Sequence, residues 1–352
     1  MNNVLSENGL TGRIAQIINC DVRQVLIINR KRFYMGSIFT LSIVQSALEL
    51  GCIYSLVALA LFISFSILNI ADLSTDGCFT LGCSVGAVVT IAGHPLLAFP
   101  AAMAAGVCSG FVTAFLQTRM GVPSILAGII VNTGLYTVNI AVMGFSSNVN
   151  LFGCDTIFSM AKEISEAKWY GEWYKLMIVA AIVLLIGVIL AWFLNTRLGL
   201  SIRATGDNEY MVRASSINPV FMITVGLCVA NSLTALSGAV LAQYQKSCDI
   251  NLGTGMVTIA LASLIIGETL IGKGGMFKKV TGVIYGSCLY RFIVAVALRL
   301  SVPAECLKLV SALIVAFAIA FPYLKGKADF YRRHRIPLKR NDGSGEEDEE
   351  VC

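Results

Sequence analysis

Charged residues are scarce in this sequence. Asp, Glu, Lys and Arg make up only 13% of its 352 residues, whereas a soluble domain carries about 25%. The two histidines, His94 and His334, have no Ser or Cys partner that would indicate a catalytic set. The 11 cysteines are scattered singly without a C-x-x-C pair, so they outline neither a disulfide framework nor a zinc site. We therefore expect no catalytic residues, no resident metal and no cofactor.

A basic stripe of the kind that binds nucleic acid is also missing. The formal net charge is +5. Lys and Arg, however, stand beside apolar runs, where the positive-inside rule places them, and not on a face with interleaved aromatic residues. We expect no nucleic-acid partner.

Long apolar runs take the place of the missing charge. Hydrophobic residues make up 56% of the chain, and the mean hydropathy is +0.77. Residues 176–193 contain no charge and, at about 1.5 Å per residue, nearly span a hydrocarbon core of about 30 Å. Comparable runs lie near residues 38–67, 78–93, 96–117, 123–143, 220–242, 252–271, 280–298 and 305–323. The sequence therefore predicts an all-α, polytopic membrane protein with about eight or nine membrane segments. A soluble all-α protein with buried helices is the rival interpretation.

The chain divides into three parts by composition. Residues 1–36 form an amphipathic N-terminal leader, which fits either a helix lying on the lipid surface or a disordered segment. Residues 37–324 form the membrane domain. Residues 325–352 are first basic and then acidic, and we expect a disordered cytoplasmic tail.

The distribution of basic residues predicts which loops face the cytoplasm. The insertion at residues 195–219 carries three arginines, which places it inside, and the loop at 145–175 then falls outside. The same counting puts the basic leader outside, against the rule, unless residues 69–93 form a re-entrant hairpin. Two cysteines in outer loops, Cys154 and Cys248, are candidates for a disulfide.

Polar residues interrupt the apolar pattern in both halves of the chain. Residues 67–87, ILNIADLSTDGCFTLGCSVGA, place Asp72 and Asp76 between two apolar runs. A carboxylate at the bilayer centre costs about 3 kcal/mol or more, so such residues usually face a cavity or a partner. The alternative is a turn at the membrane surface with solvated aspartates. A second interruption at residues 245–255 suggests broken or re-entrant helices and a weak internal repeat.

One apolar run carries a polar face. Asn132, Tyr136 and Asn139 follow the spacing i, i+4, i+7, which places them on one side of a helix. This face either lines a polar pathway or bonds neighbouring helices, the commoner use of intramembrane Asn. Further intramembrane polar residues with the same two interpretations are Glu49, Asn231 and Glu268.

Residues 265–276, IIGETLIGKGGM, resemble a phosphate-binding loop. Gly267, Gly272 and Lys273 fit the spacing G-x-x-x-x-G-K, but Gly274 stands where such a loop carries the hydroxyl that binds Mg²⁺. The stretch also follows an apolar membrane run and not a buried strand. We interpret these glycines as sites of close helix packing and a tight turn.

The cytoplasmic insertion carries a recognisable pattern. Its residues RLGLSIRATGDNEYMVRASSINP resemble the cytoplasmic loop of permease subunits of ABC importers, in the branched-chain amino acid/ribose permease superfamily. The break ILNIADLSTDGCFTLG is similar to that of a narrower branch, the tryptophan/tyrosine transport permeases. The resemblance covers about residues 40–325.

The resemblance implies a division of labour in the plasma (cytoplasmic) membrane. Two permease copies, expected as a homodimer in membrane lipid, form the pathway. Separate ATPase subunits hydrolyse ATP, and an extracellular solute-binding lipoprotein delivers a small solute, an aromatic or branched-chain amino acid. The positions that correspond to the coupling helix that docks on the ATPase are Gly206, Asp207, Asn208, Arg213, Ala214 and Ile217.

Two points stay open at this stage. The family has Gly immediately before the Ile of this motif, whereas this chain has Ser216, so the turn after the coupling helix is in question. The alternative function is an ion-coupled secondary carrier that uses Asp72 or Asp76 as its proton or sodium site.

Overall fold

The structure is a computed structural model. It describes residues 41–165, 173–271 and 274–299 and five positions between 309 and 320. The chain forms two units, residues 1–42 and 43–352, and the described residues belong to the second except for positions 41 and 42. The expected leader and tail lie outside the described residues, as does almost all of the run at 305–323.

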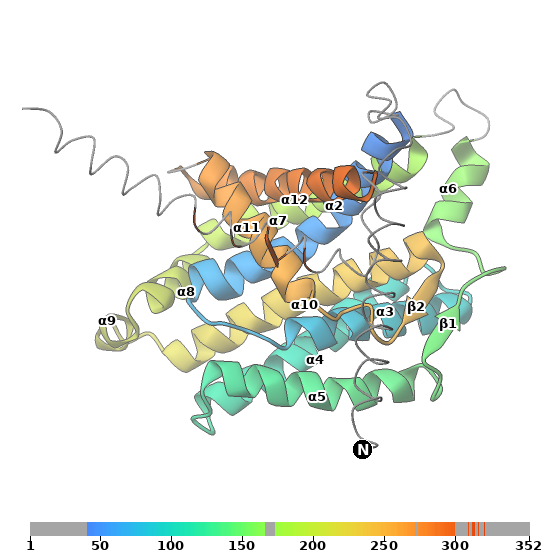
Figure 1. The fold of residues 1–352 in the computed structure, drawn as a ribbon. Coiled ribbons are helices and arrows are strands. Elements are labelled where there is room, and N and C mark those ends of the chain that lie inside the picture. Colours follow the sequence, from blue (N-terminus) through green and yellow to red (C-terminus); the bar gives the residue numbers. More distant parts are fainter. Residues whose placement is uncertain are drawn as a thin grey trace, which may run out of the picture. The chain divides into compact units, whose positions relative to one another are not determined.

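The described residues are mostly helical. Those before the cytoplasmic insertion form α2 (Leu41–Leu61), the π-helix η2 (Phe62–Ile67), α3 (Thr75–Ile91), α4 (Ala98–Thr118), α5 (Ser124–Val142), β1 (Asn148–Asn150), α6 (Ile157–Ser165) and α7 (Tyr174–Asn195). The insertion and the residues after it form α8 (Arg197–Asp207), α9 (Glu209–Ala214), α10 (Pro219–Gln245), β2 (Ser247–Asp249), α11 (Met256–Ile271) and α12 (Met276–Arg299). Strands β1 and β2 pair antiparallel. They lie at the opposite end of the long helices from α8 and α9 (Figure 1).

Six helices in the described part of the chain are long and apolar enough to cross a membrane. They are Leu41–Ile67, Ala98–Thr118, Ser124–Val142, Tyr174–Asn195, Pro219–Gln245 and Met276–Leu298. The runs expected at 78–93 and 252–271 form the shorter helices α3 and α11, of 17 and 16 residues. At about 1.5 Å per residue they fall short of the hydrocarbon core.

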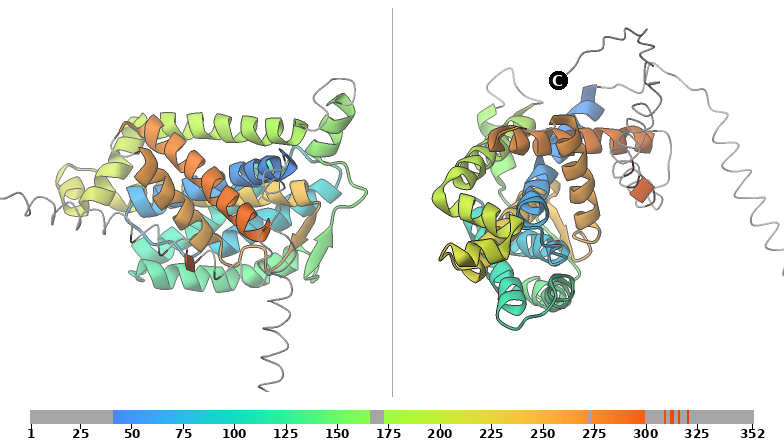
Figure 2. Two further views of the ribbon diagram at one scale, coloured as in Figure 1. Left: turned by 45° about the horizontal axis from the view of Figure 1, so that its top comes forward. Right: turned by 90° about the vertical axis from the view of Figure 1, so that its left-hand side faces the viewer.

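Helix α10 packs against α3 and α4 through small residues. A β-carbon added at Gly82 or Gly86 of α3 would collide with the backbone of Ala235 or Ala239, so α3 runs parallel to α10. The glycines of α4 face the backbone of α10 in the opposite order, so α4 runs antiparallel. Glycine has no side chain, so the helix backbones approach closely. In lipid, this close packing stabilises helix contacts in place of the hydrophobic effect. Around these helices, α5 and α7 lie on opposite sides (Figure 2).

The predicted break between α2 and α3 is present. Helix α2 ends in η2, where the Leu68 N–H donates to the Ile63 carbonyl at 2.9 Å, and Asn69 then adopts a left-handed φ of +56°. A β-carbon at Gly206 of α8 would collide with the carbonyl oxygen of Ile67, so η2 ends beside α8. Because α3 runs parallel to α10, away from α8, residues 68–91 lead from the end of the helices at α8 toward the other end. They therefore do not form an outer re-entrant hairpin.

The candidate disulfide between two cysteines of the predicted outer loops is not formed. Cys154 and Cys248 are both free thiols in the structure. Cys248 lies in β2, where it is fully buried.

Candidate functional site

The break buries a carboxylate. Asp72 is 2% exposed; its Oδ1 accepts the Ser74 N–H at 2.8 Å, and its Oδ2 accepts the Asn231 amide at 3.1 Å. The interpretation as a solvated surface turn is therefore wrong for Asp72. A buried charge needs such donors, and here they come from the break itself and from α10.

A second carboxylate joins the two short helices. Asp76, in the first turn of α3, accepts the Gly255 N–H at 3.0 Å and the Val257 N–H at 2.9 Å. Those amides belong to the start of α11, whose N–H groups have no partner within the helix. Asp76 therefore caps α11 from a distant part of the chain, and its negative charge lies at the positive end of that helix.

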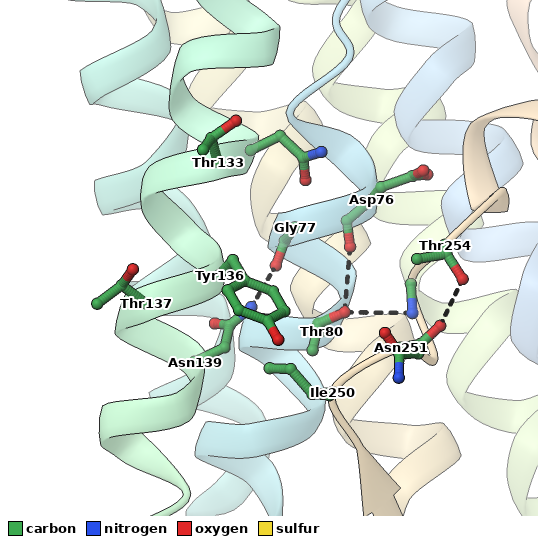
Figure 3. A pocket seen from close by; sticks show the side chains of 12 residues that line it. Asp76, Gly77, Thr80, Thr133, Tyr136, Thr137, Asn139, Ile250, Asn251 and Thr254 are labelled. Carbon is green, nitrogen blue, oxygen red and sulfur yellow. Dashed lines mark hydrogen bonds between the residues drawn. The ribbon is translucent and has the colours of Figure 1, made fainter. Parts of the chain in front are cut away.

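A polar pocket of about 400 Å³ lies beside this junction. It is lined by Asp76, Gly77, Thr80, Asn132, Thr133, Tyr136, Thr137, Asn139, Ile250, Asn251, Gly253 and Thr254. Four of the five predicted pathway residues are among them, namely Asp76, Asn132, Tyr136 and Asn139. Asp72 is not. The side chains of Tyr136 and Asn139 come from α5, and Asn251 and Thr254 face them from the segment before α11 (Figure 3).

The α5 wall of the pocket is partly buried and partly open. Asn139 is 1% exposed and donates to the Gly77 carbonyl at 3.1 Å, while its own Oδ1 is buried without a partner. Tyr136 is 51% exposed, and Thr133 and Thr137 are exposed too. Polar side chains on a membrane-spanning helix are unfavourable against lipid. This wall must therefore face water or another protein surface.

The pocket's chemistry is that of binding. Asp76 is the one charged residue of its lining, and its carboxylate points away from α5 toward the start of α11 (Figure 3). The remaining polar groups are hydroxyls and amides. Across the described residues, no three His, Cys, Asp or Glu side chains are grouped to hold a metal ion.

The insertion at residues 195–219 folds as two helices. Asn208 separates them and caps α9, since its side chain accepts the Met211 N–H at 3.1 Å. Arg213 pairs with Glu209 at 2.9 Å on the same exposed surface. Such an exposed i,i+4 pair contributes only about 0.3–0.5 kcal/mol.

The six residues assigned to coupling do not share one surface. Asp207, Asn208, Arg213 and Ala214 are exposed. Gly206 instead faces inward onto Ile67, and Ile217 packs against the core.

Ser216 makes the turn for which the family uses glycine. Its φ is +59°, a left-handed value that glycine adopts without strain and that other residues reach at a cost. The departure at this position therefore leaves the turn in place.

Sequence reasoning missed two exposed residues and one charged residue. Tyr210 and Met211 are 84% and 70% exposed on α9, and a large apolar pair between charges was the available signal. Arg291 lies within the membrane helix α12, with its guanidinium 3.5 Å from the ring centre of Tyr54. A lone Arg in the run at 280–298 could have indicated it.

The other intramembrane polar residues bond neighbouring groups. Glu49 accepts the Tyr244 hydroxyl at 2.7 Å, and Glu268 accepts the Ser66 hydroxyl. Asn231 donates to Asp72, as described above. Of the two interpretations, a polar pathway and hydrogen bonds to neighbouring helices, these bonds fit the second.

The stretch that resembles a phosphate loop is a helix contact where it is described. A β-carbon at Gly267 of α11 would lie 2.5 Å from the Gly282 carbonyl oxygen of α12. Gly272 and Lys273 lie outside the described residues. Close packing at Gly267 confirms the structural interpretation for that glycine.

Comparison with known proteins places the chain in a family. The family described as "Branched-chain amino acid transport system / permease component" matches residues 43–319. The tyrosine transport system permease protein of Clostridioides difficile (strain R20291) is 33% identical over 276 residues, covering 78% of this chain and 90% of that protein. The ribose import permease protein RbsC of Escherichia coli (strain K12) is 28% identical over 264 residues, covering 70% and 75%.

One further relative matches a shorter part of the chain. The D-allose transport system permease protein AlsC of Escherichia coli (strain K12) is 36% identical over 108 residues, covering 30% of this chain and 33% of that protein. No solved structure matches the chain. With six candidate spans, the chain is a multi-pass protein of the plasma membrane. It belongs to the family of branched-chain amino acid transport system permease components.

Proposed function

We propose that this chain is the membrane-spanning subunit of an ABC importer that carries a small solute, an aromatic or branched-chain amino acid, across the plasma membrane. The family supports the transport role, and the relative named for tyrosine supports the amino acid. ATP hydrolysis belongs to a separate ATPase subunit. A solute-binding lipoprotein delivers the solute at the end that carries β1, β2 and α6.

The observation that carries this proposal is the exposed tip of α9, which is fixed to the membrane helices. Tyr210 and Met211 project from it with 84% and 70% of their surface exposed, beside the charges of Asp207 and Arg213. Helix α8, directly before it, is anchored by Ile202, which is fully buried. Exposed aromatic and Met side chains on a rigid helix are typical anchors of a protein interface.

The solute pathway in this proposal runs along the polar pocket at α5. A second copy of the chain completes it, because hydroxyls and amides on the open wall are unfavourable against lipid. We count α3 and α11 as membrane segments, each completed by the non-helical residues that precede it. With the run at 305–323 this gives about eight or nine segments, and the two units of break and short helix, 68–91 and 246–271, are the remnants of an internal repeat.

An ion-coupled carrier is the weaker alternative. It would use Asp72 or Asp76 as an ion ligand, yet each carboxylate already accepts two N–H donors. Those bonds suit a structural role better than repeated binding and release of an ion.

The proposal predicts a gene for an ABC-type ATPase beside the gene of this chain, and the test uses the two gene products together. Tyr210→Ala with Met211→Ala should reduce co-purification of the ATPase at least tenfold, because the anchors of the interface are removed. Phe152→Ala, an equally exposed aromatic residue in the loop after β1, serves as the control and should have no effect. Asp207→Ala with Arg213→Ala should lower transport while the chain still inserts.

The opposite result is equally clear. If the isolated chain in lipid vesicles hydrolyses nucleotide, or moves solute uphill on an ion gradient without the ATPase, the importer proposal is wrong.

A further inference from the structure

Residues 68–74 connect the cytoplasmic helices to the pocket, and we call them the return segment. They leave η2 beside α8 and lead back to α3, whose first turn lines the pocket. Only nine positions separate Ile67, at the α8 contact, from Asp76, at the pocket. Movement at one end can therefore reach the other through very little chain.

The cytoplasmic end of this connection is a backbone contact. A β-carbon at Gly206 would collide with the Ile67 carbonyl oxygen and would lie 2.9 Å from the Leu68 Cα. Leu68 in turn lies over Gly226 of α10, where a β-carbon would be 2.5 Å from its Cδ1. Helix α8 thus rests on the first residue of the return segment with no side chain between them.

The return segment is stiff along its length. Its Leu68 N–H donates to the Ile63 carbonyl at 2.9 Å, and its Ile70 N–H donates to the Ser64 carbonyl at 2.8 Å. Asp72 holds the Ser74 N–H and the Asn231 amide. A segment with these bonds moves as a unit because displacing one end strains or breaks bonds along it.

The pocket end reaches both walls of the pocket. The Asp76 carboxylate holds the Gly255 and Val257 amides at the start of α11. The Gly77 carbonyl accepts the Asn139 amide of α5. A β-carbon at Gly128 of α5 would lie 2.7 Å from the Leu73 nitrogen, so the return segment also touches α5 directly.

We propose that the return segment transmits movement of α8 to the pocket, and that Gly206 is the positioning residue through which it does so. The proposal rests on the proposed function, in which an ATPase moves α8 and α9. When α8 shifts, the return segment shifts with it, and Asp76 and Gly77 carry the change to α11 and α5. The pocket opens or closes as these two walls separate or approach.

The test is Gly206→Ala. Alanine is a better helix former than glycine, so α8 itself is not weakened, and the change acts through the collision with Ile67. In the isolated chain, hydrogen exchange at the amides of Ser74, Gly255 and Val257 should rise at least tenfold, although these lie in other elements. In the complete transporter, solute transport should fall at least tenfold while ATP hydrolysis stays within twofold.

Gly187→Ala is the matched control. It makes the same change in α7, where a β-carbon would meet its nearest neighbour, Ile284, at an ordinary 3.4 Å. It should change neither exchange nor transport. If Gly206→Ala fails to fold, Leu68→Ala loosens the same contact against Gly226 and should raise exchange at the three amides about threefold.

The outcomes separate the two proposals. Unchanged exchange in Gly206→Ala or in Leu68→Ala overturns the transmission role, as does a fall in transport and ATP hydrolysis together. Raised exchange in a chain that recruits no ATPase supports the connection and contradicts the proposed function instead.

Discussion

At the scale of single residues, Asp76 determines how α3 and α11 meet. Asp76→Ala leaves the Gly255 and Val257 amides without their acceptor. A hydrogen bond to a charged acceptor contributes about 1.5–3 kcal/mol, so we expect the free energy of unfolding to fall by about 3 kcal/mol. Denaturant unfolding in detergent micelles measures it. The control is Asp155→Ala at an exposed outer position, and an equal loss in both variants would contradict the capping role.

At Ser216 we expect a substitution that raises the free energy of unfolding. A φ of +59° costs a residue with a side chain roughly 1–2 kcal/mol, and glycine avoids this strain. Glycine also raises the entropy of the unfolded chain, which offsets part of the gain. Ser216→Gly should therefore stabilise the chain by about 0.5–1 kcal/mol. Ser215→Gly, one residue earlier at φ −85°, should destabilise it. Thermal unfolding of both variants measures the two changes in stability. If only Ser215→Gly stabilises the chain, the backbone at Ser216 is not strained.

At the scale of elements, the contact between α3 and α10 depends on missing side chains. Gly82→Ala places a methyl group against the Ala235 carbonyl oxygen, so the two helices must separate. Overpacking of this kind costs about 1–3 kcal/mol, and we expect a loss of that size in the free energy of unfolding. Gly187→Ala in α7, which has room for the methyl group, should cost less than about 0.5 kcal/mol. Equal effects would show that the α3–α10 contact tolerates separation.

The elements also show what the sequence could predict. The spacing of Asn132, Tyr136 and Asn139 predicted one helix face, and the structure confirms that all three line one pocket. The two aspartates predicted a break, because charge and glycine interrupt an apolar run. Local patterns of this kind are visible in sequence because helix periodicity is local.

Other features depend on contacts between distant residues. The bond from Asp76 to Gly255 joins residues 179 positions apart. Nothing near either residue indicates its partner. The same holds for Gly206, which sequence likeness assigned to the ATPase surface and which the fold turns inward onto Ile67. The lengths of α3 and α11, 17 and 16 residues, also do not follow from hydropathy, because an apolar run does not show where a helix within it begins.

At the scale of the whole molecule, the open polar wall of α5 must face water or another protein surface. Thr133 and Thr137 are exposed on a helix that is otherwise apolar enough to cross the membrane. The Thr133 hydroxyl already bonds the Ile129 carbonyl of its own helix, but lipid offers the Tyr136 hydroxyl and the pocket amides no hydrogen bonds. In the proposed dimer a second copy encloses a wet pathway between two such walls. We therefore expect Thr133→Cys and Thr137→Cys, each in a chain whose native cysteines are replaced, to cross-link two copies with a short bis-maleimide in native membranes.

The matched control for this cross-link is Leu185→Cys. Leu185 is 62% exposed on α7, the helix on the opposite side from α5 (Figure 2), and its apolar surroundings suit contact with lipid. We expect no dimer band from this variant, because lipid separates copies there. A membrane-impermeant maleimide should label Thr137→Cys from water but leave Leu185→Cys unmodified. Cross-linking through α7 with none through α5 would place the interface between copies on the other face and would remove the pocket from the pathway.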